Sequence, residues 1–79
     1  MKINLLKFDE NRLVEAIERY GAINGHAPRY IIMSESTLDN FLSKYYDMRY
    51  GDKQSYHYQF HGTLVATCNN LENGEVDIV

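Results

Sequence analysis

Two stretches of the chain repeat hydrophobic residues at the three- and four-residue spacing of an amphipathic helix. The first follows Asp9, whose carboxylate can accept the free amides of a first helical turn, and it ends at Gly21. The second follows Ser34 or Ser36 as its cap and ends at Gly51. The spacing predicts two helices, with apolar positions at Leu13, Ala16, Ile17 and Tyr20 in the first and at Leu38, Phe41, Leu42, Tyr45 and Met48 in the second.

The hydrophobic stretches outside the two predicted helices have the patterns of extended segments. Residues 3–6 give a brief extended lead-in, and residues 30–33 form a continuous apolar run, which is typical of a central strand covered on both faces. Residues 56–68 alternate in character, with Gly62 expected at a bulge or bend, and residues 75–79 alternate as a last strand. We therefore expect one α+β domain over residues 1–79. Two helices pack on a short mixed sheet of three to four strands, in the order helix-strand-helix-strand-strand.

Composition narrows the functional classes. The chain has 79 residues, of which 44% are hydrophobic and 24% charged, and a net charge of −3. A nucleic-acid binder normally carries a basic face, so nucleic acid is not an expected partner. No transmembrane run or signal peptide is visible, which predicts no membrane contact and a cytoplasmic location. Cys68 is the only cysteine, so a disulfide within the chain is excluded.

His57 and His61 are the first candidates for chemistry, because two histidines four residues apart on a helix can share a metal ion. Their neighbours alternate with a period of two, however, and this favours a strand. On a strand their Cα atoms lie about 13 Å apart, at roughly 3.3 Å per residue. Zinc bonds are about 2 Å long, so we expect solvent-facing strand histidines and no metal site.

A nucleophilic site has little support in the sequence. Cys68 ends an apolar strand, where a cysteine usually behaves as a small hydrophobe, although His61 could serve as its base. Ser34 and Ser36 lack the flanking glycines of a nucleophile elbow, and capping accounts for both. The acidic residues Glu72, Glu75 and Asp77 lack the ligand spacing of an EF-hand. We expect no catalytic residue, no cofactor and no metal.

Tyrosine is the unusual feature of the composition, with seven residues against three phenylalanines and no tryptophan. Tyrosine rings suit half-buried positions and are enriched in protein interfaces. We expect an interaction surface on the second helix and the strand after it, formed by Tyr45, Tyr46, Tyr50, Tyr56 and Tyr58.

The stretch "GHAPRYIIMSESTLDNFLSKYYD", followed by "FHGTLVATCNNLENGEVDIV", resembles a segment of the major capsid proteins of tailed bacteriophages. In that family, P-x-x-I-I-M-S-x-x-T opens a helix, and an aromatic-x-Gly-x-x-Val strand later precedes a turn with L-x-x-G. The matching residues are Pro28, Ile31, Ile32, Met33, Ser34, Thr37, Leu38 and Leu42, and then Phe60, Gly62, Val65, Leu71 and Gly74. The resemblance implies an α+β domain like the one around the axis of a capsomer, which works by protein–protein contact. The family's N-terminal arm, extended loop and spine helix have no counterpart, so it implies a small phage or prophage protein that reuses the domain.

The function we expect is non-enzymatic binding of protein, either a second copy of the chain in a homo-oligomer or another phage or host protein. Its expected location is the cytoplasm of the bacterial host, with association with the virion as a second location. Two alternatives stay open. One is a phage-encoded inhibitor that binds a host enzyme or defence complex, and the other is a metal or thiol enzyme built on His57, His61 and Cys68.

Overall fold

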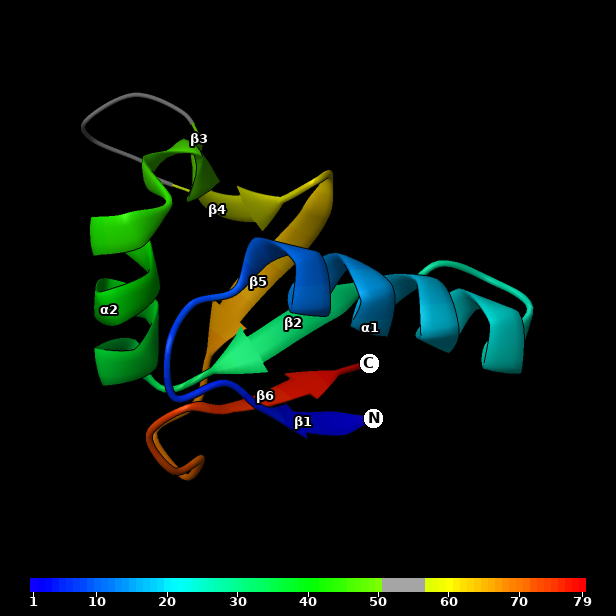
Figure 1. The fold of residues 1–79 in the computed structure, drawn as a ribbon, viewed down its shortest axis with the longest axis horizontal. Coiled ribbons are helices and arrows are strands. Elements are labelled where there is room, and N and C mark those ends of the chain that lie inside the picture. Colours follow the sequence, from blue (N-terminus) through cyan, green and yellow to red (C-terminus); the bar gives the residue numbers. More distant parts are fainter. Residues whose placement is uncertain (51–56) are drawn as a thin grey trace.

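The chain forms two helices and one mixed sheet in the computed structural model, which describes residues 1–50 and 57–79 (Figure 1). The helices are α1 (Glu10–Asn24) and α2 (Glu35–Lys44), and a short 3-10 helix, η1 (Tyr46–Met48), follows α2. The strands are β1 (Lys2–Asn4), β2 (Tyr30–Met33), β3 (Arg49–Tyr50), β4 (His57–Phe60), β5 (Thr63–Thr67) and β6 (Glu75–Ile78).

The α+β class, the two helices and the mixed sheet agree with the sequence prediction, whereas the number of strands does not. The described strands lie in the order β1-β6-β2-β5-β4-β3, so the expected three to four strands were too few. β2 runs parallel to β5 and antiparallel to β6, and every other pairing is antiparallel. The strands that the prediction did not separate, β1, β3 and β4, have two to four residues each. Each is stabilised by pairing with another strand: β1 with β6, β3 with β4, and β4 with β5 across a turn. The hydrophobic pattern of so few residues cannot reveal them.

Both helices begin where their caps predict. The carboxylate of Asp9 accepts the backbone N–H of Arg12 at 3.2 Å, and the hydroxyl of Ser34 accepts that of Thr37 at 3.2 Å. These bonds satisfy amides that have no partner inside their own helix. Ser34, rather than Ser36, is therefore the cap of α2.

The C-terminal ends of both helices differ from the prediction. α1 continues past Gly21 to Asn24, and Gly25 ends it by adopting a left-handed φ of 76° and donating its N–H to the carbonyl of Gly21. α2 stops at Lys44 instead of running to Gly51. The 3-10 turn that follows brings Met48 into the core and starts β3, which pairs with β4.

Residues 57–67 form a hairpin rather than one bent strand. Phe60 pairs with Thr63, and the two residues between them, His61 and Gly62, have φ angles of 48° and 84°. Two successive positive φ angles are characteristic of a type I′ turn, which reverses the chain in two residues. Gly62 therefore lies in a turn between β4 and β5, where a bulge or bend was expected.

The two faces of the sheet have different surroundings. One core joins residues of both helices to alternate residues of the strands, so α1 and α2 cover the same face (Figure 1). We call this the covered face; its most buried strand residues are Ile31, Met33, Phe60, Thr63, Val76 and Ile78. The opposite, uncovered face carries no buried residue among the described strands. β2 is central in the sheet, as predicted, but the prediction that both its faces are covered was wrong.

Candidate interaction surface

The predicted tyrosine surface is only partly within the described chain. Tyr56 and the side chains of Tyr46 and Tyr50 lie outside the part that the structure describes. Tyr45 and Tyr58 are half-buried and pack against the core. Their contact with a partner stays a prediction.

Tyr45 belongs to an aromatic cluster at the rim of the covered face. Its ring centroid lies 5.4 Å from that of Phe8 and 5.4 Å from that of Phe60. Burial, the charges of Glu10 and Asp47 and a hydrogen bond to Glu10 together raise the pKa of its hydroxyl. The ring thus connects the end of α2 to the β1–α1 connection and to β4.

His61 contacts the first turn of α1 through Glu10. The Glu10 carboxylate accepts from Nε2 of His61 at 3.0 Å, and the two side chains are 44% and 49% exposed. Surface pairs of this kind contribute about 0–1 kcal/mol because water screens them. The pair resembles a base with its carboxylate, but its exposure is typical of a structural contact that holds the hairpin turn against α1.

The other candidate groups for chemistry lie apart. Cys68 follows the end of β5 and His61 precedes its start, so about 16 Å of extended chain separates them. The Cys68 thiol is half-buried, and its backbone N–H donates to the carbonyl of Met33. Within residues 1–50 and 57–79, no group of three or more His, Cys, Asp or Glu side chains is arranged to hold a metal ion.

The structure reveals a surface that the sequence prediction missed. Four apolar side chains of β2 and β5 lie on the uncovered face, where Tyr30 pairs with Leu64 and Ile32 with Ala66. Tyr30 is 43% exposed and Leu64 is 47% exposed, while Ile32 and Ala66 are half-buried. We call these four residues the apolar strip. They form a continuous patch because partners in neighbouring strands point to the same face.

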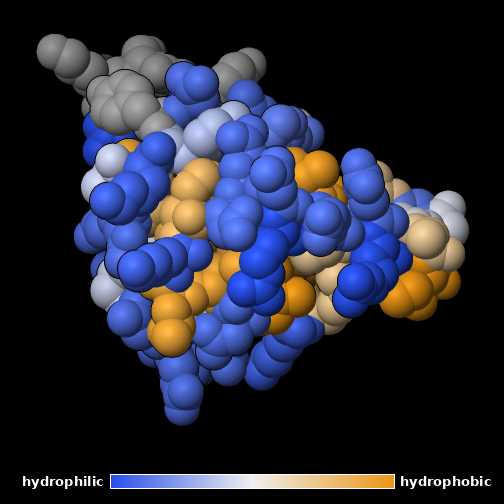
Figure 2. All heavy atoms as spheres, in the orientation of Figure 1, coloured by the Kyte–Doolittle hydropathy of each residue, from blue (hydrophilic) through white to orange (hydrophobic). Residues whose placement is uncertain are grey.

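Polar groups border the apolar strip. On one side, β6 contributes Glu75 and Asp77: the Lys2 ammonium of β1 lies 3.7 Å from the Glu75 carboxylate, and the amino group of Met1 lies 3.4 Å from the Asp77 carboxylate. On the other side, β4 contributes Gln59, which pairs with Leu64. An apolar centre with a polar border is the usual composition of a protein interface. The helix side of the molecule differs, since hydrophilic side chains predominate there between small hydrophobic areas (Figure 2).

The hydrophobic pattern of β5 hides this surface, because Thr63 is buried whereas the neighbouring Leu64 is exposed, the reverse of what their hydrophobicity predicts. The signal that the sequence does carry is helix content, since two helices of 15 and 10 residues are too few to cover both faces of a wide sheet. The pattern alone could not show which face they leave open.

No protein-family model, no curated protein and no solved structure matches this chain. Among the described helices, none is both long and apolar enough to cross a membrane.

Proposed function

We propose that this chain is a non-enzymatic phage- or prophage-encoded protein that acts in the host cytoplasm by protein–protein contact, with a second copy of itself as its partner. The observation that carries the proposal is the apolar strip on the uncovered face. Contiguous apolar surface on a folded domain commonly marks an interaction site, because its burial is favourable by about 25 cal/mol per Å².

A second copy suits this surface for a geometric reason. Two antiparallel or mixed sheets pack face to face when each presents apolar side chains on the same side of its strands. A two-fold axis brings the same patch of both copies together, so one apolar strip is sufficient to form the whole interface. Tyr30 and Leu64, the two most exposed members, would be its central contacts.

The capsid resemblance supports the same class of function. Its first motif, Pro28 to Thr37, spans β2, the cap Ser34 and the first turn of α2. A domain at the axis of a capsomer works through contacts between copies, and such contacts need an exposed surface of this kind. The proposed relation is therefore to a capsid-type domain reused in a small protein.

The oligomeric state of the native chain and of two variants tests the proposal. Analytical ultracentrifugation should show association of the native chain and a monomer for Leu64→Glu, because a carboxylate in the apolar strip cannot be buried without large cost. Ile23→Glu is the matched control, since Ile23 is 71% exposed at the end of α1, away from the uncovered face. It should associate like the native chain.

Two results would contradict this proposal. The first is that the native chain remains monomeric at millimolar concentration and that a pull-down with it captures no protein from host lysate. The second is equal association of Leu64→Glu and the native chain. A stoichiometric complex with one host protein, in place of self-association, would instead select the inhibitor alternative.

A further inference from the structure

The free edge of the sheet at β1 offers unpaired backbone groups. The carbonyl of Met1 accepts the N–H of Ile78 at 2.8 Å, and the N–H of Leu5 donates to the carbonyl of Gly74 at 2.7 Å. Antiparallel pairing alternates, so the backbone groups of Met1, Ile3 and Leu5 point toward β6. Those of Lys2 and Asn4 therefore point outward, and no described strand pairs with them on that side.

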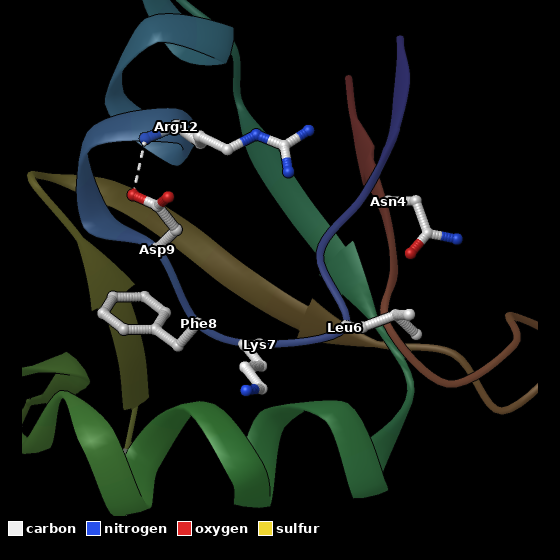
Figure 3. Close-up of a pocket in the computed structure, with 6 residues that line it drawn as sticks. All are labelled: Asn4, Leu6, Lys7, Phe8, Asp9 and Arg12. Atoms are coloured by element: carbon white, nitrogen blue, oxygen red, sulfur yellow. Dashed lines mark hydrogen bonds between the residues drawn. The ribbon is translucent and has the colours of Figure 1, made fainter.

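Two hollows lie along this edge, between β1 and α1. The larger, of about 480 Å³, is lined by Asn4, Leu6, Lys7, Phe8, Asp9 and Arg12 (Figure 3). The smaller, of about 100 Å³, is lined by Met1, Ile3, Arg12, Glu15, Ala16 and Arg19. Arg12 belongs to both, and in Figure 3 its side chain extends from α1 toward β1. We call the two hollows together the β1 groove.

The β1 groove is lined by three cationic side chains, Lys7, Arg12 and Arg19, and by two acidic ones, Asp9 and Glu15. Arg12 and Arg19 lie seven residues apart on α1, which corresponds to about 10.5 Å along the helix axis. Neither guanidinium forms an ion pair with a described carboxylate, including the nearby Glu15. The carboxylate of Asp9 already accepts the first-turn amide of Arg12. Two arginine forks are thus available to an incoming chain.

We propose that the β1 groove binds an extended acidic segment of a partner protein, which adds to β1 as a further strand. The backbone groups of Lys2 and Asn4 would form its ladder with the segment, as in other cases of strand addition. Acidic side chains at alternate positions of a strand point to one face, about 6.6 Å apart. The separation of Arg12 and Arg19, about 10.5 Å along the helix axis, lies between one and two of these intervals, so their long, flexible side chains can each reach one carboxylate, whose geometry suits the guanidinium fork.

This surface is separate from the apolar strip. The β1 groove lies at the edge of the sheet and against α1, whereas the apolar strip lies on the opposite face, on β2 and β5. The inference therefore does not depend on the proposed self-association. Because only a short ladder can form, we expect weak binding.

The test uses the full chain labelled with ¹⁵N. The probe is a seven-residue peptide of alternating threonine and glutamate, blocked at both ends, and its control replaces each glutamate by glutamine. The glutamate peptide should shift the amide signals of Lys2 and Asn4 and slow their hydrogen exchange. The glutamine peptide should bind at least tenfold more weakly.

Variants of the chain test the two arginines and the backbone edge of β1 separately. Arg12→Glu with Arg19→Glu should weaken binding of the glutamate peptide at least tenfold, whereas Arg29→Glu, outside the groove, should leave it unchanged. Asn4→Pro removes an outward N–H without removing a bond to β6, and it should also weaken binding. Circular dichroism confirms that each variant is folded, and the arginine variants decide the question if Asn4→Pro does not fold.

Three results would overturn the inference. These are no binding of the glutamate peptide at 5 mM, equal affinity for both peptides, or amide shifts confined to the apolar strip. None of them changes the oligomeric state of the Leu64→Glu variant, so this proposal and the self-association proposal fail independently.

Discussion

The two faces of the sheet differ in burial although both carry apolar side chains on β2. Ile31 and Met33 point to the covered face and are fully buried, whereas Tyr30 and Ile32 alternate with them and face outward. The same four-residue run thus supplies a core on one side and a surface on the other. What separates them is the position of the two helices, which both pack on the side of Ile31.

In a small domain, apolar side chains of one strand can therefore have two different roles. A chain of 79 residues can cover one face of such a sheet with its own helices, and the other face is left for water or a partner. Truncating a side chain on the covered face should therefore destabilise the fold. Truncation on the uncovered face should instead change association.

The largest expected effect compares Ile31→Ala with Leu64→Ala. Ile31 is fully buried, and its truncation should lower the free energy of unfolding by about 2–5 kcal/mol. Leu64 is half-exposed, so its truncation in dilute solution should change that free energy by less than about 1 kcal/mol. Urea unfolding at low protein concentration measures both. Similar losses for the two variants would contradict the assignment of the faces.

A smaller effect concerns the bond that joins α2 to the start of β6 on the covered face. The Thr37 hydroxyl accepts the buried N–H of Gly74 at 2.9 Å and lies 2.8 Å from the hydroxyl of Ser34. Thr37→Val keeps the shape but leaves that N–H without a partner, which should cost about 1–3 kcal/mol. Thr67→Val, at an exposed threonine, is the control and should be nearly neutral in the same urea titration.

The smallest effect appears only at high pH, at the rim of the covered face. Burial and the neighbouring Glu10 and Asp47 raise the pKa of Tyr45 above its ordinary value near 10. Because the pKa is higher in the folded state, the protonated Tyr45 hydroxyl makes its full contribution to the free energy of unfolding below about pH 10. This contribution is lost as the pH rises through the folded-state pKa. Stability of the native chain should fall more steeply above pH 10 than that of Tyr45→Phe.

The same change on the uncovered face, Tyr30→Phe, serves as the control for the pH experiment. Thermal unfolding at intervals between pH 8 and pH 11 gives the three profiles. An unchanged profile for Tyr45→Phe would show that Tyr45 carries no pH-dependent stability.

The local features of this protein follow from its amino-acid sequence. The cap Asp9, the cap Ser34 (one of two serines that the pattern offered), the helical spacing of Leu38, Phe41 and Leu42 and the alternation in β6 depend on neighbouring residues, and they appear in the structure. Tyr45 and Met48, predicted on the same helix, lie beyond its end. The β2 run was also identified as a central strand, and it does lie between β6 and β5, although the cover on both faces that its continuous apolar character indicated is absent.

The remaining features depend on contacts between residues that are distant in the sequence. β1 becomes a strand because β6, more than seventy residues away, pairs with it, and the burial of Thr63 beside an exposed Leu64 depends on which face the helices cover. The apolar strip and the β1 groove both result from these long-range choices. A hydrophobic pattern specifies which residues share a face, but the pairing of distant strands and the side on which the helices pack determine whether that face meets protein or water.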